Sequence, residues 1–282
     1  MEAHRSKFRV AKMAEVLNVS RSGFYAYLAR PVSDRQRKNE ILLEKIKEIH
    51  QKSKATYGYP RIADDLKDQA AGSPAPSKNR VYRLMRAAGI RAKTVKKYKA
   101  TTNSNHDLPV AENLLNREFS TDKPNQKWVS DITYIWTEEG WLYLAGVMDL
   151  CGRTIVGFSM ADHMRKSLVI NALNQAIGRT KAGEGLLVHS DRGVQYASHA
   201  YQKVLKKNGF KCSMSRRGNC WDNAPMESFW GKLKQEWLYG NRFRTRDEAK
   251  TAIFEYIEIF YNRRRKHSTI NYKVPMDFMK AA

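Results

Sequence analysis

The chain has 282 residues and is 42% hydrophobic, which is enough for one large domain or two smaller ones with a buried core. Its 51 Lys and Arg residues outnumber its 28 Asp and Glu residues, and the net charge of +23 favours a polyanionic partner, most often nucleic acid. This composition excludes a disordered chain, and no stretch has the roughly 18 to 20 apolar residues that a membrane helix needs.

The cysteines and histidines argue against disulfide bonds and a structural metal. Cys151, Cys212 and Cys220 show no CxxC spacing, and the first residues contain no apolar segment typical of a signal peptide. We therefore expect a reduced, cytoplasmic compartment. The seven histidines are scattered along the chain, which argues against a structural zinc site.

Residues 1–30 are predicted to contain a helix-turn-helix. Apolar residues recur at helical spacing before Asn18, which can turn the chain, and Ser20 is suited to cap a second helix. That second helix carries Arg21 and Tyr25 in its early turns, where a recognition helix meets a DNA groove. A plain helical hairpin is the alternative interpretation.

Residues 33–95 are predicted to form a basic, all-helical DNA-binding region. A long amphipathic helix over residues 35–53 would bury a stripe made of Ile41, Ile46 and Ile49. Two shorter helices would follow, over residues 59–69 and 77–90. The last of these carries Arg80, Arg83 and Arg86 on one face, which indicates either a DNA-binding surface or a solvated basic face.

A breaker-rich linker over residues 96–122 is expected to separate the helical region from a core over residues 123–282. Within the core, β-branched and aromatic runs alternate with amphipathic segments. Strands are predicted over residues 128–136, 141–150, 154–161, 185–191 and 211–215, and helices over residues 165–180, 198–210, 225 onward and 245–267. This order implies a mixed sheet covered by helices.

Three aspartates lie inside predicted strands or at their ends. Asp131 interrupts an apolar strand, where a charge is costly unless a partner compensates it. Asp191 directly follows a buried strand. Asp149 ends the second strand beside a CGR turn and is better explained as a turn-forming residue.

The helix that begins near Pro225 carries a further acid, Glu227, in line with Lys234. Seven residues at about 100° each return to within about 20° of the starting direction. Glu236 faces the opposite side, and Asp222 lies in the preceding loop. Glu227 is therefore the acid best suited to share a site with a lysine, although helix geometry alone favours an ordinary surface arrangement of the two side chains.

Four segments together resemble the second-reading-frame (OrfB) transposase of the bacterial insertion-sequence-three family, which has a retroviral-integrase-like core. These segments are NLLNREFSTDKPNQKWVSDITYI, VHSDRGVQY, NCWDNAPMESFWGKLKQE and YNRRRKHSTINYKVPMDF. Asp131 and Asp191 have 59 residues between them, Asp191 and Glu227 have 35, and Lys234 follows Glu227 by seven, as in the D,D-35-E class. The resemblance covers the chain from about Asn113 to its end, and less specifically the helical region before it.

The resemblance implies an α/β fold, an RNase H-like mixed five-stranded sheet flanked by helices and preceded by an all-α helix-turn-helix region. It also implies a catalytic triad of Asp131, Asp191 and Glu227. Three carboxylates around one cleft repel one another unless cations neutralise them, and hard oxygen ligands select Mg²⁺ or Mn²⁺. We expect two such ions, about 3.5–4 Å apart, to assist cleavage at the insertion-sequence ends and transfer of the 3′-hydroxyl.

The expected partner is double-stranded DNA, as transposon terminal repeats and as target. Synapsis of two ends implies a homo-multimer, an upstream reading frame could supply a partner protein, and the site of action would be the bacterial nucleoid. Lys234 and Lys232 are expected to hold DNA phosphate near the metal ions. Trp221 would stack on a splayed base or anchor the core.

Two further features have structural alternatives. His189, two residues before Asp191, is expected to have a structural role rather than to ligate metal. The run Arg263–His267 is interpreted as a patch that contacts the DNA backbone, or else as a solvated helix end.

Two other functions compete with a transposase. An RNase H-like, structure-specific nuclease would hydrolyse DNA without producing a joined product. A helix-turn-helix regulator with an inactive core would keep DNA binding when the acids are removed, but the intact triad argues against it.

Overall fold

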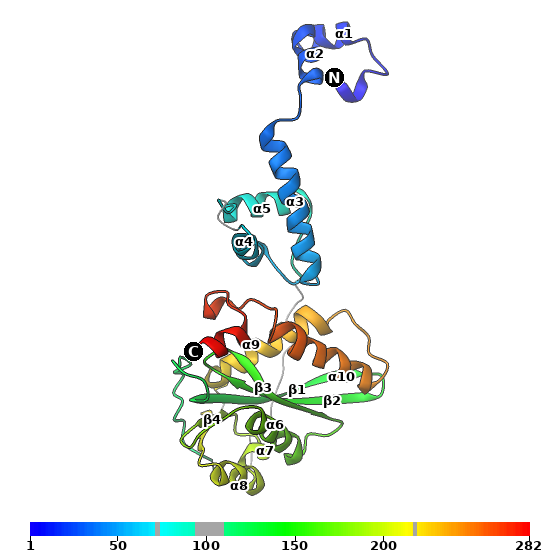
Figure 1. The fold of residues 1–282 in the computed structure, drawn as a ribbon. Coiled ribbons are helices and arrows are strands. Elements are labelled where there is room, and N and C mark those ends of the chain that lie inside the picture. The colour runs from blue at the N-terminus through cyan, green and yellow to red at the C-terminus, as the bar shows by residue number, and fades with distance from the viewer. Residues whose placement is uncertain (71–73, 94–109, 217–218) are drawn as a thin grey trace.

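The computed structural model describes residues 1–70, 74–93, 110–216 and 219–282. Its N-terminal part is helical, as Figure 1 shows. It comprises a short 3-10 turn, η1 (Glu2–His4), and the helices α1 (Val10–Val16), α2 (Arg21–Ala29), α3 (Asp34–Lys52), α4 (Tyr59–Asp68) and α5 (Lys78–Ala87). Serines cap three of these helices: Ser20, Ser33 and Ser77 each accept a hydrogen bond from a backbone N–H three residues on. Asn18 turns the chain between α1 and α2 with φ of 50°.

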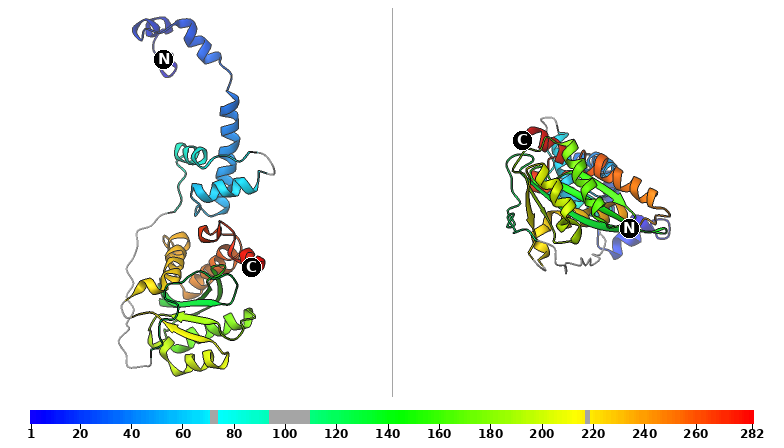
Figure 2. Two further views of the ribbon diagram at one scale, coloured as in Figure 1. Left: turned by 90° about the vertical axis from the view of Figure 1, so that its left-hand side faces the viewer. Right: turned by 90° about the horizontal axis from the view of Figure 1, so that it is seen from below.

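Helices α3, α4 and α5 pack into one small unit, which we call the helical module. Its core contains Ile46, Ile49, Ile62 and Val81, all buried. The expected stripe along α3 was wrong at Ile41, which is 62% exposed. The reason is that α4 and α5 cover only the C-terminal half of α3, and its first turns extend toward α1 and α2 beyond them (Figures 1 and 2).

The core contains a five-stranded sheet in the order β3-β2-β1-β4-β5. Its strands are β1 (Lys127–Thr137), β2 (Gly140–Asp149), β3 (Thr154–Ala161), β4 (Leu187–Ser190) and β5 (Lys211–Met214). The first three strands form an antiparallel meander, whereas β4 and β5 run parallel to β1. This is the RNase H-like arrangement predicted from the sequence, and it makes the first and fourth strands neighbours.

Helices cover both faces of the sheet (Figure 1). One face is covered by α6 (Lys166–Arg179), α7 (Val194–Ala197) and α8 (His199–Lys207), and the other by α9 (Ala224–Leu233) and α10 (Arg246–Phe254). Side chains of β1 alternate between the two layers: Trp128 and Ile132 join the cluster under α6, whereas Val129 and Ile135 join the cluster under α9. Asp131 has the parity of Val129 and therefore faces the α9 layer.

Helices α9 and α10 each continue into a π-helical segment, η3 (Lys234–Leu238) and η4 (Glu255–Tyr261). The chain then leaves the helix, so the expected helix to His267 was too long by six residues. The end of the chain forms a 3-10 turn, η5 (Ser268–Ile270), and helix α11 (Pro275–Ala281). The Arg263–His267 run therefore lies on a connecting segment rather than on a helix.

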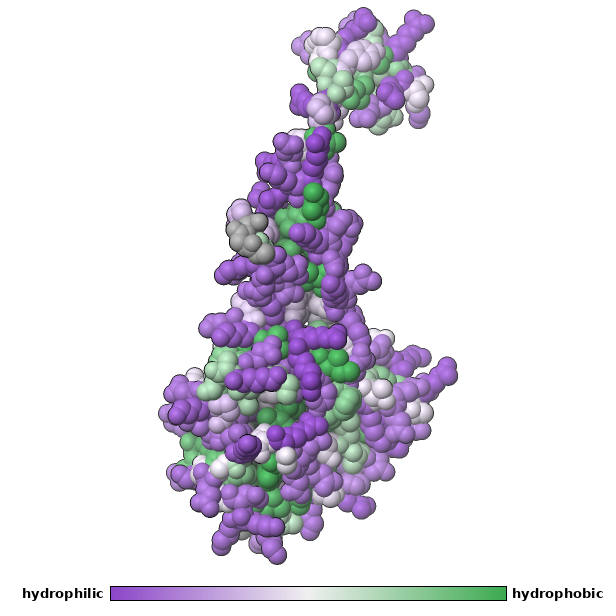
Figure 3. Space-filling model, in the orientation of Figure 1, coloured by the Kyte–Doolittle hydropathy of each residue, from purple (hydrophilic) through white to green (hydrophobic). Residues whose placement is uncertain are grey.

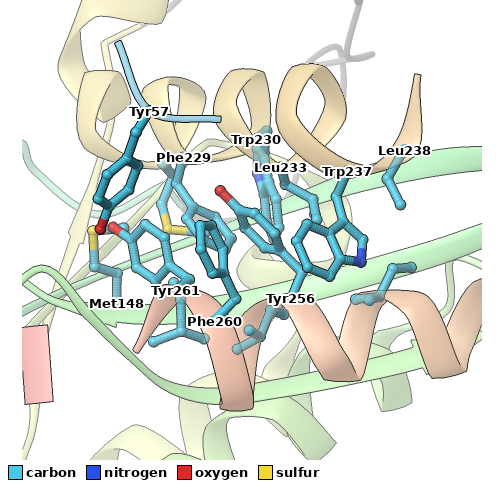
Figure 4. Packing of buried hydrophobic residues seen from close by; sticks show 14 of the residues in the cluster. Tyr57, Met148, Phe229, Trp230, Leu233, Trp237, Leu238, Tyr256, Phe260 and Tyr261 are labelled. Atoms are coloured by element: carbon cyan, nitrogen blue, oxygen red, sulfur yellow. The ribbon is translucent and has the colours of Figure 1, made fainter. Parts of the chain in front are cut away.

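Aromatic side chains join α9, η3 and η4 into one cluster (Figure 4). Trp237 stacks on Phe260 with ring centroids 5.3 Å apart, and Phe229 meets Tyr261 edge to face at 4.7 Å. Phe229 of α9 and Trp237 of η3 thus both contact aromatic rings of η4. At one end the cluster includes Tyr57, which belongs to the helical module.

The segment 110–122, half of the expected linker, packs on the core. Leu115 is buried, and the backbone N–H groups of Leu114 and Leu115 donate to the Ser213 hydroxyl on β5. The other half of the expected linker lies mostly outside the described residues. Among the described residues, no helix is both long enough and apolar enough to span a membrane.

Candidate active site

Strand pairing brings Asp131 and Asp191 to the same level of the sheet. The parallel register joins Val129 of β1 to His189 of β4, and two further residues along each chain lead to Asp131 and Asp191. The β4 strand ends at Ser190, so Asp191 stands at its carboxyl end, the usual place for a ligand in a parallel arrangement. Asp191 then accepts a hydrogen bond from the Gly193 N–H at 2.9 Å, which shapes the following turn.

Helix α9 presents Glu227 to the same region. The helix starts with Pro225 in its first turn, where proline is favoured, and Glu227 lies exposed in that turn. The preceding 3-10 turn, η2 (Cys220–Asn223), is tied to β1, because the Asn223 side-chain amide donates to the Ser130 carbonyl at 3.1 Å. This bond holds the start of α9 beside the residue that precedes Asp131.

Asp222 has a structural role in that turn rather than a catalytic one. It is fully buried and binds the guanidinium groups of Arg117 and Arg216 at 2.8 Å and 3.1 Å. Burial alone would raise the pKa of its carboxyl, but the hydrogen bonds from Arg216 and Arg117 lower that pKa strongly. The prediction that set Asp222 aside is consistent with these contacts.

The three acids influence one another electrostatically. Burial raises the pKa of Asp131 well above its ordinary value, and the negative charges of Asp191 and Glu227 raise it further. The strand register and the bond from Asn223 to Ser130 bring these carboxylates, which are far apart in the sequence, into one region, and the repulsion follows from that placement. A cation would relieve the repulsion, and carboxylate oxygens are ligands suited to Mg²⁺.

Trp230 is a site residue whose role the sequence left open. Its indole N–H donates to Oδ2 of Asp131 at 3.0 Å, and its ring is buried against β2. Gly146, the β2 partner of Asp131, makes this approach possible, because a Cβ there would lie 2.8 Å from the Trp230 ring. The only sequence signal was a glycine inside an otherwise bulky strand.

Lys234 reaches β1 from the start of η3. Its Nζ lies over the Tyr134 ring, 5.2 Å from the centroid. Burial lowers the pKa of its amine, while the negative charge of Asp131 opposes that shift. Lys234 is thus close enough for the charge of Asp131 to act on it, and its contact with DNA phosphate stays a prediction.

The sequence of the chain matches known families over most of its length. Residues 121–220 and 208–275 match the Integrase core domain, and residues 36–98 match the HTH-like domain. Transposase InsF for insertion sequence IS3A of Escherichia coli (strain K12) is 42% identical over 270 residues, which cover 95% of this chain and 93% of that protein. The chain belongs to the IS3 family of transposases.

A second relative of this transposase comes from Shigella sonnei. The insertion element IS600 uncharacterized 31 kDa protein is 47% identical over 266 residues, covering 94% of this chain and 97% of the relative. Among solved structures, the simian T-cell lymphotropic virus intasome in complex with PP2A regulatory subunit B56 gamma matches with 16% identity and a TM-score of 0.47, covering 83% and 74% of the two chains. The HTLV-2 integrase catalytic core domain in complex with magnesium matches with 19% identity and a TM-score of 0.42, covering 56% and 97%.

In this transposase Lys232 lies in different surroundings from Lys234. Its Nζ is 3.3 Å from Nε2 of His267, and the charges that act on it are those of Arg265, Glu236, Arg61 and Arg153. The expected place for Lys232, beside the metal ions, therefore differs from its observed place in a cavity behind α9.

The other expected DNA contacts are solvent-exposed, with one exception. Trp221 is 68% exposed in the turn before α9, so it does not anchor the core. Arg21, Tyr25 and Arg83 are exposed on α2 and α5. Arg80 instead links α5 to α3, because its Nε and one terminal nitrogen both donate to Asn39 Oδ1, at 2.9 Å and 2.7 Å.

His189 and Asp149 have structural roles. His189 is fully buried and bonds Ser213 and Ser215 of the neighbouring chain segment at 2.8 Å and 3.1 Å, and burial lowers its pKa to about 4. Asp149 accepts hydrogen bonds from the Cys151 and Asn125 N–H groups and from the Trp128 indole. Both observations agree with the roles expected from the sequence.

The expected contact of the Arg263–His267 run with DNA is wrong for the second half of the run, whose side chains are buried. Arg265 is fully buried and its guanidinium binds Glu236, with Nε 2.7 Å from Oε2. Lys266 is 8% exposed and contacts Asp64 at 2.6 Å, Asp65 at 3.0 Å and also Asp68 on α4. These two cations hold the protein together, which leaves Arg263 and Arg264 as the exposed ones.

The chemistry of the donor atoms indicates which metal ion the three acids could bind. Over residues 1–70, 74–93, 110–216 and 219–282, His, Cys, Asp and Glu side chains form no group of three already spaced to hold a metal ion. The three acids nevertheless supply oxygen donors whose mutual repulsion a divalent cation would neutralise. In its chemistry, the donor set therefore fits a divalent cation such as Mg²⁺.

Proposed function

We propose that this transposase cleaves DNA at the ends of its insertion sequence and joins the freed 3′-hydroxyl to target DNA, using Asp131, Asp191 and Glu227. The observation that carries the proposal is the strand register that brings Asp131 and Asp191 to one level of the sheet, beside the start of the helix that carries Glu227. Acids that raise one another's pKa in a shared region are typical of functional sites.

Asp131, Asp191 and Glu227 would hold two divalent cations, Mg²⁺ or Mn²⁺, through their carboxylate oxygens. Bound there, the cations would favour the ionised form of the attacking oxygen and stabilise the charge on the leaving oxygen. Trp230 orients Asp131 through its indole N–H, and Lys234 supplies a positive charge that suits a DNA phosphate beside the acids.

Both reactions then use the same arrangement. In cleavage, a water molecule loses a proton as its oxygen bonds to the phosphorus, the bond to the 3′-oxygen breaks, and that oxygen takes up a proton. In strand transfer, the 3′-hydroxyl loses its proton and bonds to a target phosphorus, and the displaced 3′-oxygen of the target is protonated. No covalent bond between protein and DNA is needed in either step.

The assembly follows from the substrate. Two transposon ends must be held together for transfer, so the working complex contains at least two copies of the chain. The helical regions, with exposed Arg21, Tyr25 and Arg83, would bind the terminal repeats, and an upstream-frame protein could complete the complex. Acting on chromosomal DNA, the protein would work at the bacterial nucleoid.

The test is strand transfer with cognate end DNA and Mg²⁺, on the full chain and on the variants Asp131→Asn, Asp191→Asn and Glu227→Gln. We expect joined product from the wild-type protein and a loss of at least about 10³-fold from each variant, because each removes a charged ligand. Nicked DNA without joined product would favour the nuclease. Unchanged activity in Asp131→Asn would exclude the triad.

A further inference from the structure

A cavity of 210 Å³ lies beside α9, and Asp131 is not among its lining residues. Its polar lining comes from three parts of the chain that are distant in sequence. These lining residues are Arg153, Ser228, Lys232, Tyr261, His267 and Thr269. Cations and hydroxyl groups thus line the cavity, and no acidic residue is among its lining residues in the described part of the chain.

The positive charge around the cavity is not balanced locally. Lys232 has a pKa lowered to about 8, because it is buried and because the positive charge of Arg265 adds to that effect. Glu236, the acid that opposes the shift, already accepts hydrogen bonds from Arg265 and from the Tyr256 hydroxyl. The negative charge of Glu236 is therefore already compensated by the Arg265 guanidinium and balances little of the positive charge at the cavity.

The hydrogen bonding of His267 shows that an acceptor is lacking here. Its Nδ1 accepts from the Thr269 N–H at 3.3 Å, and its Nε2 lies 3.3 Å from the Lys232 amine. A neutral imidazole has one N–H and one acceptor nitrogen, so Nε2 carries the proton when Nδ1 accepts. Two donors, Nε2–H and the Lys232 ammonium, then face each other, and an oxygen anion between or beside them would satisfy both.

We infer that this cavity binds a phosphate group of the DNA backbone. The inference rests on the proposed function for its choice of ligand. Ser228 lines the cavity and is the residue after Glu227, so a phosphate held by Lys232 and His267 would fix the DNA against the helix that carries the catalytic acid. Inorganic phosphate has the same tetrahedral oxyanion chemistry and is the simplest probe of the site.

The first measurement is DNA binding in the Asp131→Asn background, where no cleavage complicates the signal. A labelled cognate end duplex is titrated at several salt concentrations with Lys232 intact, with Lys232→Gln and with Lys232→Arg. We expect Lys232→Gln to bind more weakly and to lower the salt slope, d log K/d log[salt], by about one in magnitude, as loss of one phosphate contact does. Lys232→Arg should restore the slope.

The matched control is Lys206→Gln, which removes an exposed charge on α8, under the opposite face of the sheet. Its salt slope should stay at that of the parent. The second measurement is thermal stabilisation by inorganic phosphate without DNA, which should be present with Lys232 and lost in Lys232→Gln.

The outcomes separate the two sources of the ligand. Stabilisation by inorganic phosphate with an unchanged DNA slope would overturn the DNA assignment and make free phosphate the ligand. A slope and a thermal response that Lys232→Gln leaves unchanged would overturn the site itself. Failure of the proposed function is read separately, from strand transfer by the triad variants, because binding here is measured without catalysis.

Discussion

The indole N–H of Trp230 on α9 donates to Oδ2 of Asp131 on β1 across 3.0 Å. This bond joins the helix that carries Glu227 to the strand that carries Asp131, so it couples the positions of two of the three acids. It also occupies one carboxylate oxygen of Asp131 and orients the other. We therefore regard Trp230 as a positioning residue for the proposed metal site.

Replacing Trp230 with Phe should keep most of the packing and remove only the donor. Because Asp131 then loses its orienting bond, the Mg²⁺ concentration for half-maximal strand transfer should rise about tenfold, as for other residues that support metal ligands. The measurement is a Mg²⁺ titration of strand-transfer rate, with saturating DNA. A drop in the rate at saturating Mg²⁺ with no change in the midpoint would point to a purely structural role.

Gly146 is required for the same contact. A Cβ at this position would lie 2.8 Å from the Trp230 ring, so Gly146→Ala should displace the indole and shift the Mg²⁺ midpoint as Trp230→Phe does. Because the two changes act on one contact, the double variant should shift the Mg²⁺ midpoint no further than the more severe of the two single variants. This would be a non-additive result. The control is Gly178→Ala on α6, where a Cβ meets no atom within 4 Å and should cost nothing.

The meeting of Asp131 and Asp191 could be predicted because it follows from strand order. The fourth strand runs parallel to the first and pairs with its first residues, so Asp131 inside β1 and Asp191 just after β4 reach the same level of the sheet. Local sequence patterns are enough to recognise both strands. The contact between Trp230 and Asp131 could not be predicted in this way. It depends on how closely α9 approaches the sheet, which Gly146 decides from another strand.

Lys232 shows the limit of helix-face arguments. Spacing from Glu227 placed Lys234 near the acids, and α9 stays α-helical up to Leu233, so the geometry assumed for the intervening turns holds. The surroundings of Lys232, however, come from Arg153 and His267, which reach it from another strand end and from the segment after η4. A pattern within one helix contains no information about such neighbours.

Lys266 fastens the helical module to the core. Its amine lies among Asp64, Asp65 and Asp68 of α4, and although burial alone would lower its pKa, the hydrogen bonds that it donates to these acids raise it. Lys266→Met would leave three acids facing one another. We expect α4 to lose about 2 kcal/mol of protection in hydrogen exchange, within the range for breaking one side of a buried charge pair.

The matched control is Lys273→Met, an exposed lysine nearby in the sequence. It should leave the protection of α4 unchanged. Equal exchange of α4 in the wild-type protein and Lys266→Met would mean that the Tyr57 contacts, with the Arg264 carbonyl at 3.1 Å and the Lys266 N–H at 2.8 Å, are enough to hold the module in place.

His267 should make the stability of the protein fall in mild acid. Burial lowers its pKa from 6.5 to about 3, and the charges of Lys232, Arg265, Arg153 and Arg61 add to this. Below about pH 6.5, His267 therefore binds a proton in the unfolded chain but stays neutral in the folded protein. The contribution of His267 to stability is complete above that pH and is lost as the pH falls toward 3, by up to about 1.4 kcal/mol per unit.

The experiment compares urea unfolding at about pH 7.5 and pH 5.5 for the wild-type protein, His267→Gln and the exposed control His199→Gln. Between these values the wild-type protein should lose about 1.4 kcal/mol more than His267→Gln, because glutamine does not titrate. His199→Gln should follow the wild-type curve. Parallel curves for His267→Gln and the wild-type protein would show that His267 titrates normally, and the buried cationic surroundings inferred for it would then be wrong.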